Sequence, residues 1–128
     1  MWSKASGQPF VGNLSLNTGA PGPLAIPIYT VPGGPAYTLD PAERIVITNI
    51  SVSSNDTASP LVTLDDGSPA VRVVAKYYAG STLPASNEAI VPGVLQGYKA
   101  TNFRATSTAI TAAKTVEVVI RGYVTRTV

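Results

Sequence analysis

The chain has 128 residues, of which 45% are hydrophobic and only 12% are charged, and its formal net charge is +2. This length fits one domain with one core, and the composition excludes a disordered chain, which needs low hydrophobicity and high charge. Cysteine is absent, which excludes a disulfide framework and thiolate metal sites. Histidine is absent too, which removes the most common general base and metal ligand, so we expect neither catalysis nor a cofactor.

Residues 1–4 open no apolar run of signal-peptide length, and no stretch approaches the length of a membrane-spanning helix. We therefore expect a protein that is made in the cytoplasm and contacts no membrane. The low share of charge is typical of a protein that covers much of its surface with partner subunits.

Residues 1–35 are predicted to form an extended N-terminal arm. Seven of the eleven prolines and six of the eleven glycines lie in residues 1–41, and proline blocks both helix interiors and central strands. The large apolar side chains of the arm would be costly to leave in water, so it must lie on its own domain or on a neighbouring subunit. The residues predicted to make subunit contacts are Trp2, Phe10, Leu14, Leu16, Ile26, Ile28 and Tyr29.

Residues 36–128 are predicted to form a β-sandwich domain. Residues 44–54 alternate from their midpoint, with Val46, Thr48, Ile50 and Val52 predicted on one face, which is typical of a strand with one buried face. Further short strands are expected in residues 61–64, 70–78, 88–91, 99–107 and 115–124. Short strands separated by turn residues favour a sandwich or barrel, and we predict an all-β, jelly-roll-like sandwich.

Two acidic motifs are interpreted as turns. Asp65 and Asp66 are adjacent, and neighbouring strand side chains point to opposite faces, so they do not form a facing catalytic pair. Asp40 and Glu43 have the spacing of a helix capping box, but the β-rich run that follows favours a turn into a strand.

Charge is divided unevenly along the chain. Residues 1–70 hold two basic and five acidic residues, and residues 71–128 hold seven basic and two acidic ones. This division arises by chance or indicates complementary contacts between copies or with a partner. The outward-facing basic residues of the predicted strands are Arg72, Lys76, Arg104 and Arg121. They form a solvated face or a protein contact, and they are too few to track a nucleic-acid backbone.

Three segments resemble strands of small virion proteins of tailed bacteriophages: Tyr37-Thr-Leu-Asp-Pro-Ala-Glu-Arg-Ile-Val-Ile-Thr-Asn-Ile-Ser-Val-Ser-Ser-Asn55, Val94-Leu-Gln-Gly-Tyr-Lys-Ala100, and Thr115-Val-Glu-Val-Val-Ile-Arg-Gly-Tyr-Val124. The resemblance covers roughly residues 36–125 and rests on strand pattern and composition. It points to head decoration (cement) proteins, which have a jelly-roll fold and sit on the capsid exterior, commonly as trimers.

The resemblance implies a non-enzymatic virion protein. Its partners would be the major capsid protein and further copies of itself, and its arm and loops would bridge neighbouring capsid subunits. Two alternatives stay open: a tail, baseplate or fibre component, and a carbohydrate-binding module that uses the six tyrosines.

Overall fold

The computed structural model describes residues 7–82, 85–91 and 93–126, and every regular element in these ranges is a β-strand. The strands are β1 (Gln8–Asn17), β2 (Leu24–Ala25), β3 (Ile28–Tyr29), β4 (Glu43–Ser54), β5 (Leu61–Asp65), β6 (Val73–Tyr78), β7 (Ser86–Ala89), β8 (Leu95–Gln96), β9 (Arg104–Ser107) and β10 (Thr115–Arg126). The described part of the chain contains no helix long and apolar enough to cross a membrane.

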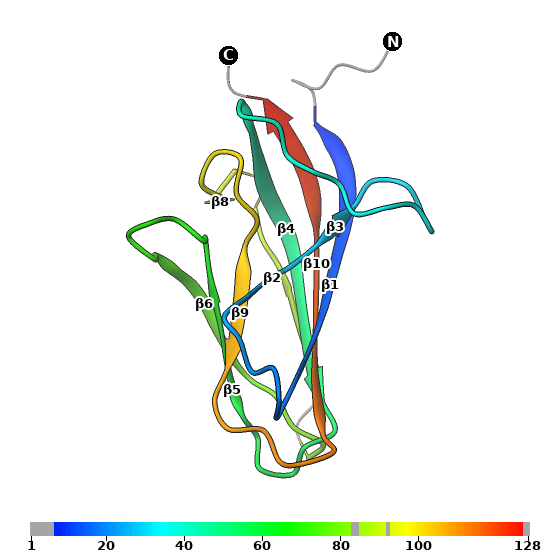
Figure 1. Cartoon of the computed structure of the whole chain (residues 1–128), viewed down its shortest axis with the longest axis vertical. Coiled ribbons are helices and arrows are strands. Elements are labelled where there is room, and N and C mark those ends of the chain that lie inside the picture. Colours follow the sequence, from blue (N-terminus) through cyan, green and yellow to red (C-terminus); the bar gives the residue numbers. More distant parts are fainter. Residues whose placement is uncertain (1–6, 83–84, 92, 127–128) are drawn as a thin grey trace.

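The strands form two antiparallel sheets that pack face to face (Figure 1). The larger sheet has the order β3-β1-β10-β4-β7, and β8 also pairs with β4. The smaller sheet has the order β2-β9-β5-β6. This architecture confirms the predicted all-β sandwich.

The core lies between the sheets, because side chains on alternate strand positions point inward. On β10, Val116, Val118 and Ile120 are buried while Glu117 and Arg121 are exposed, as the sequence pattern predicts. The smaller sheet contributes Val62, Leu64 and Ala105 to the same cluster, and Phe103, directly before β9, joins them.

Strand β4 contains a bulge that changes which of its residues face the core. Asn49 pairs with Arg121 and Ile47 pairs with Gly122, so Thr48 has no opposite residue on β10. An extra residue reverses the alternation of side chains beyond it. The core residues of β4 are therefore Ile45 and Ile47 before the bulge and Ile50 and Val52 after it. The predicted single face of Val46, Thr48, Ile50 and Val52 is correct only for the second half of the strand.

Glycine is required opposite this bulge. A Cβ atom on Gly122 would lie 1.9 Å from the carbonyl oxygen of Val46. No side chain fits there, so Gly122 lets β10 and β4 approach closely at the irregular pair.

The structure differs from the prediction that residues 1–35 are an arm separate from the sandwich. Residues 8–17 are extended, but as strand β1, which pairs with β10 along its full length from Gln8 to Asn17. The sequence Phe-Val-Gly-Asn-Leu-Ser-Leu has period two, so its apolar side chains fit the core face of a sheet. Residues 1–6 lie outside the described residues.

The proline-rich segment after β1 closes one edge of the sandwich. Its β2 end pairs with β9 in the smaller sheet and its β3 end pairs with β1 in the larger sheet, so the segment crosses between the sheets (Figure 1). The amide of Ile26 donates to the carbonyl of Phe103 at 2.8 Å, and the Asn102 side chain donates to the carbonyl of Ile26 at 2.9 Å. Ile26 and Ile28 are fully buried at this edge.

The segment before β4 is a turn, as predicted. The amide of Asp40 donates to Glu43 Oε1 at 2.9 Å, and the amide of Glu43 donates to the carbonyl of Asp40 at 3.0 Å. The bond from the Asp40 amide to the Glu43 side chain is one half of a capping box, but the Glu43 amide donates to the backbone carbonyl of Asp40, as in a turn, and the chain continues as strand β4.

Candidate interaction surfaces

Four residues that were predicted to contact a neighbouring subunit lie in the core of this chain instead. Phe10, Leu16, Ile26 and Ile28 all belong to the central cluster between the sheets. The strand pairing of β1 and β3 points Phe10, Leu16 and Ile28 inward. Ile26, between β2 and β3, is positioned by its backbone hydrogen bonds with Phe103 and the Asn102 side chain. The apolar side chains of residues 8–28 were expected to lie either on the chain's own domain or on a neighbouring subunit. In the structure Phe10, Leu16, Ile26 and Ile28 pack into the chain's own domain.

The remaining residues of that prediction have different positions. Leu14 and Tyr29 are half-buried, and Leu14 packs against the edge of the core. Trp2 lies outside the described residues. Contact with a subunit therefore remains open for Leu14 and Tyr29.

The four basic residues divide between the two sheets. Arg121 is exposed on β10 of the larger sheet, whereas Lys76 and Arg104 are on β6 and β9 of the smaller sheet. Arg72 lies in the turn before β6. The structure therefore brings Lys76 and Arg104 onto one sheet and separates Arg121 from them.

The three ion pairs among the described residues connect the acidic first part of the chain to its basic second part. Arg104 Nε lies 2.9 Å from Asp65, Arg72 Nε lies 3.2 Å from Asp66, and Arg126 lies 2.7 Å from Asp40. Part of the opposite charge of the two halves is therefore paired within one chain. The sequence could not assign these partners, because each pair depends on which distant strands become neighbours.

The adjacent carboxylates Asp65 and Asp66 hold the turn between β5 and β6. Asp65 accepts a hydrogen bond from the amide of Gly67 at 2.8 Å, and Asp66 accepts one from the amide of Ser68 at 3.0 Å. Burial raises the pKa of Asp66, but hydrogen bonds from Ser68 and Arg72 and the charge of Arg72 outweigh it, so the pKa is lowered overall. These contacts confirm the interpretation as a turn.

The other acidic side chains also have hydrogen-bond partners in this chain. Tyr37 donates its hydroxyl to the buried Glu43 at 2.9 Å, and Tyr77 donates its hydroxyl to Glu88. Among the described residues, no group of three His, Cys, Asp or Glu side chains is arranged to hold a metal ion. The arrangement of the carboxylates favours structural roles for them.

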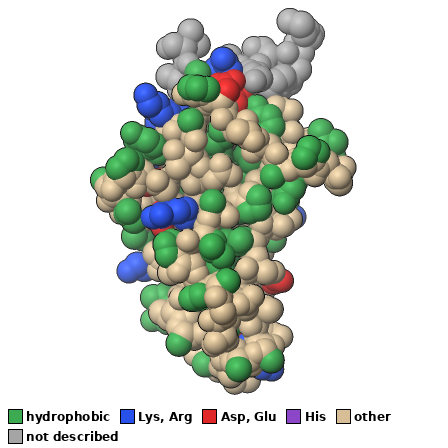
Figure 2. All heavy atoms as spheres, in the orientation of Figure 1, with side chains coloured by type: hydrophobic (Ala, Val, Ile, Leu, Met, Phe, Trp, Pro, Cys, Tyr) green, Lys and Arg blue, Asp and Glu red, His purple; other side chains and the backbone are tan. Residues whose placement is uncertain are grey.

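One exposed apolar surface lies at the edge where the proline-rich segment crosses. We call it the β1–β3 groove; it has a volume of about 400 Å³ and is lined by residues that include Pro9, Val11, Asn13, Tyr29, Thr30 and Pro32. Val31 follows at the tip of the adjoining turn and is 59% exposed. Figure 2 shows hydrophobic side chains on this projecting tip at the right of the view.

A second apolar surface lies beside the opposite edge strands. We call it the β6–β8 groove; it has a volume of about 320 Å³ and is lined by residues that include Val74, Ala75, Ile90, Val91, Val94 and Leu95. Val91 and Val94 are 70% and 73% exposed, the highest values among the large hydrophobic residues of the described chain. Sequence reasoning assigned residues 88–91 to a strand and missed this surface, because the sequence pattern does not reveal that Val91 and Val94 are exposed.

The two grooves lie on opposite edges of the sandwich. In the larger sheet β3 and β1 end one side of the order, and β7 and β8 lie on the other side, beyond β4. In the smaller sheet β2 and β6 occupy the matching ends. The same separation is visible in Figure 1, where β3 and β6 are on opposite sides. A single chain therefore presents two different apolar surfaces in two directions.

The tyrosines do not gather on one surface. Tyr78 and Tyr98 are the exposed ones, on β6 and after β8, whereas Tyr29 and Tyr123 lie half-buried on β3 and β10 of the larger sheet. A sugar-stacking platform needs several exposed rings on one face.

No family model matches the chain, and no curated protein matches its sequence. Similar solved structures include a chain of the cyanophage Pam1 capsid asymmetric unit, with 15% identity over 96% of this chain and 88% of that chain, and a TM-score of 0.45. Another is from the virus-like particle of the extra small virus of the giant freshwater prawn Macrobrachium rosenbergii, with 12% identity over 96% of this chain and 82% of that chain, and a TM-score of 0.41.

Proposed function

We propose that this chain is a structural, non-enzymatic virion protein of the head decoration type, which binds the exterior of a phage capsid and bridges neighbouring capsid subunits. The observation that carries the proposal is the pair of apolar grooves on opposite edges of one sandwich. A bridging protein needs at least two separate contact surfaces, and exposed apolar patches mark sites of protein association.

The sequence resemblance supports the same role. The three segments that resemble phage virion proteins contain β4, β8 and β10, and these strands are direct neighbours in the larger sheet, since β4 pairs with both β10 and β8. The resembling segments thus form one continuous part of the fold.

The mechanism would be thermodynamic. A protein that binds the assembled shell but not its dissociated subunits stabilises the shell by mass action. Burying one exposed valine contributes at most about 1.5–3 kcal/mol, and association costs several kcal/mol, so each chain would need both grooves or several copies. We keep the trimer that the resemblance implies as part of this proposal.

Co-sedimentation with purified capsid shells tests the role of the grooves. The variants Val31→Asp and Val94→Asp place a charge at the exposed edge of each groove, where it does not disturb the core. We expect each to weaken binding about tenfold or more, because an unpaired charge must be desolvated in the contact. Ala112→Asp, in an exposed loop away from both grooves, is the control.

Unchanged binding by both groove variants would contradict the proposed contact surfaces. Binding lost equally in the control would show that added negative charge alone prevents association. The native mass of the protein in solution tests the trimer separately.

A further inference from the structure

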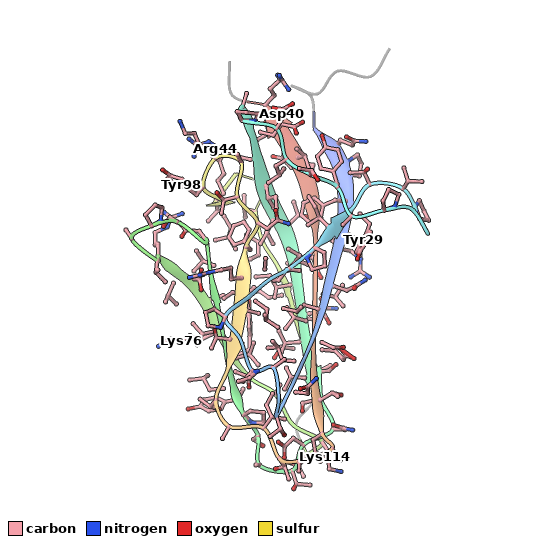
Figure 3. All side chains as sticks on the ribbon, viewed as in Figure 1. Tyr29, Asp40, Arg44, Lys76, Tyr98 and Lys114 are labelled. Atoms are coloured by element: carbon pink, nitrogen blue, oxygen red, sulfur yellow. The ribbon has the colours of Figure 1, made fainter. Side chains whose placement is uncertain are left out.

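A polar cleft adjoins the β6–β8 groove on the other side of β8. We call it the arginine cleft; it has a volume of about 610 Å³ and lies between the turn after β5 and the residues around β8. The residues that matter here are Arg44, Asp66, Pro69, Arg72 and Tyr98, all of which line it. Figure 3 shows Arg44 and Tyr98 near each other at the upper left, beside the turn that leads into β6.

The two arginines differ in how they are neutralised. Arg72 is paired with Asp66, and its terminal nitrogen donates to the carbonyl of Gln96 at 3.1 Å, which ties the turn to β8. Arg44 has one long hydrogen bond, 3.4 Å, to the carbonyl of Gly97. No carboxylate among the described residues lies within ion-pair distance of Arg44. Its guanidinium group therefore keeps most of its five donors for an external acceptor.

The lining of the cleft carries more positive than negative charge. It holds Arg44 and Arg72 but one carboxylate, Asp66, which already lies in an ion pair with Arg72. A partner that docks here is favoured by negative charge.

The composition of the cleft favours a peptide carboxylate over a nucleic acid. Planar guanidinium groups bind carboxylates through two parallel hydrogen bonds. A nucleic acid would need several cations along its path, but Asp66 neutralises Arg72 and its own carboxylate lines the same cleft. One available guanidinium beside an exposed tyrosine and a proline suits one acidic side chain with an apolar neighbour.

We propose that the arginine cleft binds an acidic segment of a partner protein, with a carboxylate on Arg44 and an adjacent apolar side chain against Tyr98 and Pro69. The site goes beyond the virion role, because the isolated protein would bind such a segment whether or not it binds a capsid.

Nuclear magnetic resonance titration of the isolated full chain tests the site. The probe is an N-terminally acetylated and C-terminally amidated octapeptide of sequence Gly-Ser-Asp-Phe-Glu-Ser-Gly-Ser, and the matched peptide has Asn and Gln in place of Asp and Glu. We expect the acidic peptide to shift the amide signals of residues 66–72 and 96–98, and the matched peptide to leave them unchanged.

Three variants assign the effect. Arg44→Gln is expected to weaken the acidic peptide about tenfold or more, since a hydrogen bond to a charged group is lost. Arg44→Lys keeps the positive charge but cannot form the two parallel hydrogen bonds of a guanidinium group, so it should give intermediate binding. Arg121→Gln removes the same charge from the outer face of the larger sheet and should change nothing.

Several results would overturn the site. These are signal shifts spread over all exposed lysines and arginines, equal binding of the uncharged peptide, equal binding by the Arg44→Gln protein, or tighter binding of a ten-nucleotide oligothymidylate at the same amides. A chain that binds the peptide but not capsids would remove the virion role and leave this site intact.

Discussion

Thr111 donates both its amide and its hydroxyl to the carboxylate of Asp56, at 2.7 and 2.8 Å, although the two residues lie in different loops. Asp56 is fully buried and also accepts a hydrogen bond from the amide of Ala58 at 2.9 Å. Its own carbonyl accepts the amide of Ser81 at 3.0 Å. One acidic residue thus fastens three loops at the same end of the sandwich, the end where Figure 3 labels Lys114.

Replacing Asp56 by Asn should destabilise the protein and flatten its acid sensitivity. Hydrogen bonds from the amides of Thr111 and Ala58 lower the pKa of Asp56 below its ordinary value of 3.8. Because the folded state lowers this pKa, the carboxylate contributes stability above pH about 4 and loses it as pH falls through the folded-state value. Urea unfolding of wild type and variant between pH 7 and pH 2.5 measures this.

The exposed residue Glu117 offers the control for that series, as Glu117→Gln. It should leave the acid dependence close to that of wild type. Parallel stability curves for wild type and Asp56→Asn across the whole range would refute the assigned role of Asp56.

Replacing Gly122 by Ala should cost about 3 kcal/mol or more, or prevent folding, because the new Cβ would lie 1.9 Å from the backbone oxygen of Val46. Gly19→Ala is the matched control, since its Cβ would meet only Asn17 Oδ1 at 3.5 Å. Thermal unfolding compares the two. A Gly122 variant as stable as the Gly19 variant would contradict the close pairing of β4 and β10.

Replacing Ile28 by Ala should destabilise the fold by about 2–5 kcal/mol, the usual cost of such a truncation in a packed core. Val31→Ala, three residues further on but exposed, should change stability by no more than about 0.5 kcal/mol. Chemical denaturation measures both. Equal, small effects would mean that the proline-rich segment does not belong to the core.

The phenol of Tyr77 should titrate far above its ordinary pKa of 10.0. Burial raises this pKa, and the hydrogen bond to Glu88 and the charge of Glu88 raise it further. The folded state therefore holds the proton, so stability is full below pH 10 and falls as pH rises above it. Ultraviolet titration of the phenolate should show a late phase that moves to lower pH in Glu88→Gln. Tyrosines that all ionise together near pH 10 would argue against the contact.

The sequence was sufficient for the fold class because period-two patterns depend only on local alternation. Val116, Val118 and Ile120 follow this rule and are buried as predicted. The pattern failed at Thr48, because a bulge depends on the partner strand and leaves no local signal.

The candidate surfaces were less predictable, for a physical reason. Ile26 and Val31 lie in the same proline-rich segment, but one is fully buried and the other is exposed at a turn. Their environments are decided by where the segment crosses between the sheets, which depends on distant strands. Arg44 likewise lines the cleft only because residues around Tyr98, far along the chain, fold beside it.

Cryo-electron microscopy of phage particles purified from a culture that produces this chain tests the proposed function most directly. The account predicts density for the sandwich on the outside of the head, with both edge grooves against neighbouring subunits. Particles whose heads lack the chain, or that carry it only in the tail, would contradict it.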